Sequence, residues 1–138
     1  MIGNSVNSSL SSASNPLVSV VLPAWNAAHT LGAALQSLFD QRPSQFGQVP
    51  EFEVVVVDDG STDETRNLLE HWRSAHLLGN RLRPLYLPHG GIVAALNAGL
   101  GTARGTLVAR MDADDTAHPH RLASQTAHLY RNEHIDLS

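Results

Sequence analysis

Three aspartates lie within four positions of one another, directly after a short apolar stretch. Residues 107–116 read LVARMDADDT, and the acidic residues are Asp112, Asp114 and Asp115. Neighbouring carboxylates repel one another and lose hydration when partly buried, so this grouping suggests a site for a cation or for proton transfer. At the carboxyl end of a strand, an Asp-x-Asp pair can offer oxygen ligands to Mg²⁺ or Mn²⁺. The alternative is an acidic turn that is only solvated.

The composition excludes several other kinds of chemistry. The chain of 138 residues contains no cysteine, and all nine of its basic residues are arginine. It therefore has no disulfide, no thiolate zinc site and no cysteine nucleophile, and it has no lysine for a P-loop or a Schiff base. Its formal charge of −4 argues against a surface for nucleic acid or for an anionic membrane.

The start of the chain differs in composition from the rest. Residues 1–15 are rich in serine and asparagine, which predicts a disordered tail, and residues 16–138 are enough for one domain with a single core. The tail has neither the basic nor the apolar region of a secretion signal. No apolar run is long enough to span a bilayer. We therefore expect a cytoplasmic protein with no membrane segment in this chain.

Apolar patterns predict strands and helices in alternation. The expected strands are 18–22, 52–57, 82–87 and 106–111. The expected helices are 27–40, a segment that begins at a capping box of Ser61 and Glu64, a segment from Ile92 to Gly105, and a segment that follows Pro119. Pro84 predicts that the third strand is an edge strand, and residues 135–137 are typical of the start of another strand.

This alternation predicts an α/β fold, with a mostly parallel, Rossmann-like sheet of order 3-2-1-4 and helices on both faces. Ligands bind at the carboxyl ends of such a sheet, near the point where the strand order reverses. Unusual residues follow strands there: Trp25, the pair Asp58-Asp59, and the cluster that begins at Asp112. We expect these residues to converge on one crevice.

The residue types at these strand ends suit a nucleoside diphosphate compound. Trp25 could stack on a base or a sugar, Asp59 could accept a hydrogen bond from a base or a ribose hydroxyl, and a metal held by the later carboxylates could neutralise a diphosphate. Alternatively, Trp25 could be a packing residue and Asp59 could cap its own helix. His118 and His120 could be metal ligands or exposed residues at a helix start.

Three segments together resemble the amino-terminal half of the family 2 glycosyltransferases, which have the GT-A fold. They read PLVSVVLPAWNAAHTLGAALQSLFDQ, FEVVVVDDGSTDETRNLLE and GGIVAALNAGLGTARGTLVARMDADD. The resemblance covers residues 16–137, and the DDGSTD and DADD segments at this separation are specific in combination. It implies a nucleotide-diphosphate sugar as donor, Mg²⁺ or Mn²⁺ as cofactor, and inverting transfer to an acceptor that could be a saccharide, a lipid or a protein.

The resemblance also implies roles for individual residues. Trp25, where the family most often has tyrosine, lies against the nucleotide base, and Asp59 contacts that base. Asp112 and Asp114 contact the ribose and the metal on the diphosphate, with Asp115 beside them as a third metal ligand. The donor-binding set is completed by Pro23, Asn26 and Ala113. The catalytic base of such enzymes lies on the acceptor side, beyond Ser138, so we expect this chain to be a donor-binding half that is truncated at its carboxyl end.

Two other functions are compatible with parts of the sequence. Residues 112–116 match the D-x-D-x-T pattern of haloacid-dehalogenase-like phosphatases, in which Asp112 would be the nucleophile and Asp114 the acid/base. That family needs a downstream lysine and places the motif after the first strand, whereas this chain has no lysine and three expected strands precede the motif. The second alternative is a non-catalytic nucleotide-binding module on the same fold.

Overall fold

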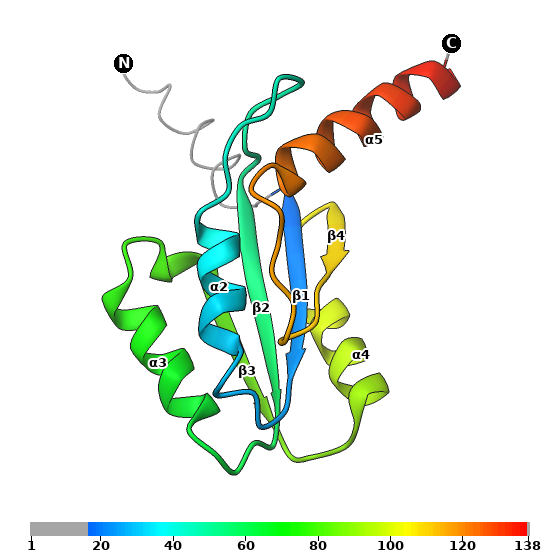
Figure 1. The fold of residues 1–138 in the computed structure, drawn as a ribbon. Coiled ribbons are helices and arrows are strands. Elements are labelled where there is room, and N and C mark those ends of the chain that lie inside the picture. Colours follow the sequence, from blue (N-terminus) through cyan, green and yellow to red (C-terminus); the bar gives the residue numbers. More distant parts are fainter. Residues whose placement is uncertain (1–16, 138) are drawn as a thin grey trace, which may run out of the picture.

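The computed structural model describes residues 17–137, and the side chains of residues 17–129 (Figure 1). The tail predicted for residues 1–15 lies outside the described residues. Within them, the strands are β1 (Val18–Ala24), β2 (Phe52–Asp59), β3 (Leu82–Leu87) and β4 (Leu107–Arg110). All adjacent strands are parallel and the order is β3-β2-β1-β4, which confirms the predicted sheet. Pro84 lies in the edge strand β3, as expected.

Helices cover both faces of this sheet, as predicted (Figure 1). They are α2 (Leu31–Phe39), α3 (Thr65–Ala75), α4 (Ile92–Thr102) and α5 (Arg121–Leu137). One face of β1 and β2 packs against α2, α3 and the start of α5, and the other face packs against α4. β1 and β2 are buried along their whole length because both of their faces are covered. None of the helices within residues 17–137 is both long and apolar enough to cross a membrane.

Several predicted boundaries are wrong, and the expected strands 18–22, 52–57 and 106–111 differ from β1, β2 and β4 by one or two residues at their ends. α2 begins at Leu31 rather than at residue 27, because residues 27–30 form a turn in which the carbonyl oxygen of Ala27 accepts hydrogen bonds. α4 ends at Thr102, three residues before Gly105, and Gly105 instead lies against the backbone of β1. The strand expected at 135–137 is wrong because α5 continues through Leu137.

The capping box predicted for α3 is also wrong. The helix begins at Thr65, and its N-cap residue Glu64 makes no capping hydrogen bond through its side chain. The hydroxyl of Ser61 instead accepts a hydrogen bond from the backbone N–H of Asn26, at 2.8 Å. Asp63 takes the capping role that was predicted for Ser61, because the Asp63 carboxylate accepts a hydrogen bond from the N–H of Thr65 at 2.9 Å.

A buried carboxylate ties the amino ends of the strands together. Glu53 of β2 accepts hydrogen bonds from the Ser19 hydroxyl of β1 at 2.5 Å, from the Arg83 guanidinium of β3 at 2.5 Å, and from the Arg104 N–H at 2.7 Å. Burial alone would raise the pKa of Glu53, but these hydrogen bonds outweigh it and hold the pKa below its ordinary value. Ser19 also accepts a hydrogen bond from the Gly105 N–H, so the network fixes where β4 begins.

α4 lies so close to the sheet at Gly99 that there is no room for a side chain at this position. A Cβ atom added at Gly99 would lie 2.5 Å from a methyl carbon of Val21 in β1 and 3.1 Å from one of Val57 in β2. These methyl groups belong to stiff β-branched side chains in a filled core, so they have little freedom to move aside. α4 can therefore reach its position on the sheet only with glycine at residue 99.

We expect Gly99→Ala to destabilise the protein by about 1–3 kcal/mol, because the added methyl group overpacks the contact between α4 and the sheet. Gly101→Ala in the same helix is the matched control, since nothing lies within 4 Å of its added Cβ. It should stabilise the protein by up to about 1 kcal/mol through helix propensity. Urea unfolding followed by circular dichroism measures both, and equal stabilities of the two variants would contradict this packing.

Candidate functional site

Two adjoining hollows lie at the carboxyl ends of β1, β2 and β4. The first has a volume of about 230 Å³ and the second of about 440 Å³. The first is lined by Pro23, Ala24, Trp25, Asp59, His89, Gly91, Ile92 and Ala95. The second is lined by Pro23, Trp25, Asn26, Ala27, Thr30, Ile92, Arg110, Asp112, Ala113 and Asp114. Trp25, Asp59, Asp112 and Asp114 are thus together at one edge of the sheet, in two hollows that share Pro23, Trp25 and Ile92 rather than in one crevice, whereas Asp58 and Asp115 line neither hollow.

Trp25 stands on the wall between the hollows. Its side chain is 54% exposed, so the alternative that it is a core packing residue is wrong. The indole ring stacks on the imidazole of His89, with ring centroids 4.7 Å apart and the planes inclined by 27°. Trp25 therefore presents a large, partly held aromatic surface at the end of β1, which is suited to contact with a flat ligand.

Asp59, at the end of β2, is buried and already bonded within the protein. It is 5% exposed, and it accepts hydrogen bonds from the N–H groups of Gly90 at 2.9 Å and Gly91 at 3.0 Å. The hydrogen bond from Gly90 does most to lower the pKa of Asp59; those from Gly91 and His89 add to it, and together they outweigh the opposing effect of burial. Asp59 thus holds the turn before α4, and the alternative that it caps the helix after its own strand does not match these contacts.

His89 links Asp59 to Trp25. Its Nδ1 lies 3.0 Å from a carboxylate oxygen of Asp59 and 3.1 Å from the carbonyl oxygen of the same residue. Since both neighbours are acceptors, Nδ1 must carry a proton and donate it. Gly60 lies so close to the backbone of His89 that an added Cβ atom would be 2.5 Å from the backbone nitrogen of His89. Its φ of 74° also favours glycine. The turn after β2 and the turn before α4 therefore form one packed unit.

Asn26 joins the turn after β1 to the turn after β2. Its Oδ1 accepts hydrogen bonds from the backbone N–H of Thr62 at 2.8 Å and of Asp63 at 3.3 Å. Its φ of 49° lies in the left-handed region, which asparagine tolerates better than most residues. Asn26 lines the second hollow, but its side-chain oxygen is engaged within the protein, so it acts on any ligand mainly by fixing these turns.

The acidic turn after β4 has the donor set of a divalent cation site. One carboxylate oxygen from each of Asp112, Asp114 and Asp115 lies within 4.8 Å of the others, and Asp114 and Asp115 are exposed. An oxygen of Asp112 lies 3.0 Å from a nitrogen of the Arg110 guanidinium. Oxygen atoms at this spacing can share one ion with bonds of about 2.0–2.6 Å. An all-carboxylate set of this kind fits Mg²⁺ or Mn²⁺ rather than a thiophilic metal.

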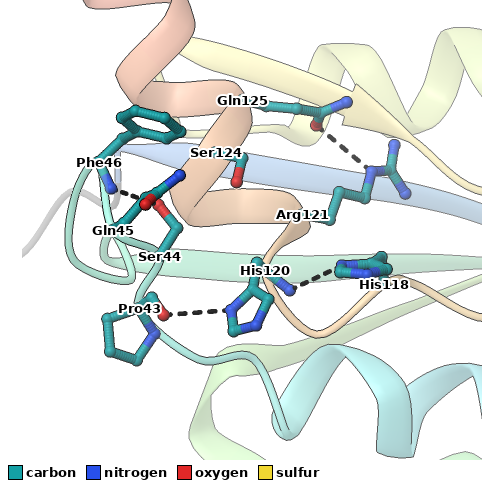
Figure 2. Close-up of a pocket in the computed structure, with 9 residues that line it drawn as sticks. All are labelled: Pro43, Ser44, Gln45, Phe46, His118, His120, Arg121, Ser124 and Gln125. Atoms are coloured by element: carbon teal, nitrogen blue, oxygen red, sulfur yellow. Dashed lines mark hydrogen bonds between the residues drawn. The ribbon is translucent and has the colours of Figure 1, made fainter.

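His118 and His120 do not join this acidic turn. They lie beside the end of α2 and the start of α5, where they line another pocket of about 580 Å³ together with residues 43–46 (Figure 2). Nδ1 of His118 accepts a hydrogen bond from the N–H of His120 at 3.2 Å, and Nδ1 of His120 lies 3.1 Å from the carbonyl oxygen of Pro43. Among the described residues, the candidate metal group of three or more ligands contains neither histidine.

Comparison with known proteins identifies the family. The family described as "Glycosyl transferase family 2" matches residues 19–137, which is nearly the whole described chain. The chain belongs to this family. The phosphatase alternative is therefore wrong, and the structure agrees, because its D-x-D-x-T motif follows β4 rather than β1.

Two relatives with known sequences illustrate the similarity of this chain to other proteins. An uncharacterized glycosyltransferase of Haemophilus influenzae is 35% identical over 121 residues, which are 87% of this chain and 35% of that protein. The chondroitin synthase of Pasteurella multocida is 35% identical over 106 residues, 75% of this chain and 10% of that protein. This chain thus spans about a third or less of the length of these relatives.

Two solved structures that share the fold contain nucleotide sugars. S. aureus TarS in complex with UDP-GlcNAc has a TM-score of 0.70 and 31% identity, over 83% of this chain and 31% of that one. The mannosyltransferase PcManGT of Pyrobaculum calidifontis, in complex with GDP-Man and Mn²⁺, has a TM-score of 0.70 and 30% identity, over 82% of this chain and 32% of that one. These likenesses confirm the predicted GT-A fold.

Among the titratable residues that line the two hollows, sequence reasoning missed His89 and Arg110. A histidine directly before two glycines, at the end of the third predicted strand, was a usable signal for His89, because that turn had to reach the same sheet edge. Arg110 precedes the acidic cluster by two positions and was treated only as part of a strand. Its contact with Asp112 arises because the chain turns immediately after β4.

We expect Asp59→Asn to lower the free energy of unfolding by about 1–3 kcal/mol at neutral pH, because Gly90 and Gly91 donate to different carboxylate oxygens and asparagine places an NH2 donor at one of these two positions. The folded-state pKa of Asp59 is lowered from 3.8, so its contribution is complete above that pH and is lost as the pH falls through the lower folded value. The difference between wild type and variant should therefore shrink below about pH 4. Urea unfolding from pH 3 to 7 measures it, with the exposed Asp40→Asn as control. A difference that does not change with pH would contradict the pairing.

Proposed function

We propose that this chain forms the donor-binding part of a metal-dependent, inverting glycosyltransferase. Family membership supports sugar transfer from a nucleotide sugar. The observation that carries the proposal for this site is that the exposed ring of Trp25 and the carboxylates of Asp112 and Asp114 face the same hollow. An aromatic surface on one side and a cation site on the other match a ligand with a base at one end and a diphosphate at the other.

Each part of the site has a separate task in this proposal. Trp25 stacks on the base, and Asp59 keeps the turn of residues 89–91 in place beside it. Asp112 and Asp114, with Asp115, hold Mg²⁺ or Mn²⁺, which would neutralise the charge that develops on the departing diphosphate. Pro23 and Ala113 complete the walls of the hollow. The complex of PcManGT with GDP-Man and Mn²⁺ supports the combination of a divalent ion and a nucleotide sugar in this site.

The acceptor side of the reaction is not built from these residues. Inversion requires a base that takes the proton from the attacking acceptor hydroxyl. Asp59 is engaged with backbone amides, and the three aspartates of the acidic turn are assigned to the cation, which makes them poor bases. We propose that the base lies in a region of the longer relatives outside the part that is similar to this chain.

We expect nucleoside diphosphate binding to require a divalent cation, because the site carboxylates and the diphosphate would otherwise repel one another. Asp114→Ala should remove most of the binding. Trp25→Ala should remove less, since stacking contributes about 0.5–1.5 kcal/mol beyond area burial. Calorimetry with UDP, GDP and ADP, with and without Mn²⁺, measures this. Binding that persists unchanged in excess chelator would show that the metal role is wrong.

We also expect little sugar transfer by this chain alone, because a positioned base is missing from the proposed site. The measurement is release of nucleoside diphosphate from the donor that calorimetry selects, with Mn²⁺ and a mixture of saccharide acceptors. Turnover near the range of about 1–10³ s⁻¹ that is typical of enzymes would contradict this expectation. A failure to bind any nucleotide would instead favour a module that keeps the fold without this function.

A further inference from the structure

The side chain of Arg110 enters the second hollow from the end of β4. Its side chain is 53% exposed, and it lines this hollow together with Asp112 and Asp114. Among the described residues that line the two hollows, Arg110 is the one arginine, and the chain has no lysine. The permanent positive charge of the site therefore comes from this guanidinium.

The backbone of Arg110 is held by hydrogen bonds, whereas its guanidinium is half-exposed. Its carbonyl oxygen accepts a hydrogen bond from the guanidinium of Arg121 at 2.9 Å. The next residue, Met111, donates its N–H to the carbonyl oxygen of Val21 in β1 at 3.1 Å. By contrast, the half-exposed guanidinium pairs with an oxygen of Asp112 at 3.0 Å, and exposed pairs of this kind are worth little. Changing its partner would thus cost little.

The charges of the proposed site do not balance with a divalent ion alone. The acidic turn carries the carboxylates of Asp112, Asp114 and Asp115, and each phosphate of a bound donor adds a further negative charge. A planar guanidinium offers several N–H donors in a geometry that matches phosphate oxygens. Among the described residues that line this hollow, Arg110 is the one with a permanent positive charge to meet them.

We propose that Arg110 is a donor-binding residue that exchanges partners. Without metal, its guanidinium occupies an oxygen of Asp112; when a divalent ion takes that carboxylate, the guanidinium turns to the diphosphate of the nucleotide. The proposal rests on the donor-binding function proposed above. In the absence of a diphosphate, Arg110 competes with the metal for the Asp112 carboxylate. When a diphosphate is present, Arg110 and the metal bind it together.

This exchange predicts opposite effects of one substitution on two measurements. Arg110→Gln keeps a polar side chain of similar length without the charge. It should bind Mn²⁺ alone as tightly as wild type or more tightly, because the competing cation is gone. Binding of UDP, GDP or ADP in the presence of Mn²⁺ should become about tenfold weaker or more, as is typical when a charge-assisted hydrogen bond is lost.

Calorimetry on the whole chain tests the proposal with Mn²⁺ alone and with Mn²⁺ plus whichever of the three nucleotides binds wild type most tightly. Arg42→Gln removes the same charge from an exposed position away from both hollows and should change neither affinity. Arg110→Lys keeps the charge, guards against a folding defect in Arg110→Gln, and should recover part of the nucleotide affinity.

The outcomes are distinguishable. If Arg110 only neutralised the acidic turn, its removal would strengthen the binding of Mn²⁺ and of Mn²⁺ with nucleotide alike, and this result would overturn the proposal. Nucleotide affinity that is equal in wild type, Arg110→Gln and Arg110→Lys would overturn it as well. Wild-type protein that binds no nucleotide at any Mn²⁺ concentration would contradict the donor-binding function itself.

Discussion

The hydrogen bonds that Asp59 receives from Gly90 and Gly91 decide the shape of the site. They join the end of β2 to the turn before α4, and this turn carries His89 onto the face of Trp25 at the end of β1. Burying a carboxylate costs free energy unless its oxygens accept hydrogen bonds, so the buried position of Asp59 depends on its hydrogen bonds to this turn. The aromatic wall of the hollow is therefore a consequence of a carboxylate that is itself almost hidden from solvent.

Glu53 does for the amino ends of the strands what Asp59 does for the carboxyl ends. Both residues belong to β2, the strand that is paired on both sides by β1 and β3. Glu53 binds side chains of β1 and β3 and a backbone amide just before β4, so all strands of the sheet meet at one charge. With both ends of β2 tied in this way, the spacing between the end of β1 and the end of β4 is set by the sheet. Trp25 and Asp112 thereby line the same hollow.

The strands, helices and layers could be predicted because they depend on the regular spacing of apolar residues. The strand order could be predicted because right-handed crossovers allow few arrangements of alternating strands and helices. The contacts of Ser61 and Asn26 could not, because they join turns that are 35 positions apart, and a local capping pattern gives no sign of a distant competitor. The helix over residues 135–137 was missed for another reason: short apolar segments do not distinguish a strand from a helix. The acidic turn was found because its residue types, rather than their contacts, point to its chemistry.

The carboxylates at the carboxyl edge of the sheet differ in how fully the protein satisfies them. Asp59 receives two backbone N–H groups and an imidazole, so little capacity is left for a ligand. In the acidic turn, Asp112 has one half-exposed arginine as its side-chain partner, and Asp114 and Asp115 are exposed to solvent. A cation gains most from carboxylates that the protein has left accessible, and a fold gains most from those that it has saturated. The same residue type thus serves as scaffold at the end of β2 and as a site for an ion after β4. Arg110 belongs with the second group because its guanidinium pairs with Asp112, one of those accessible carboxylates.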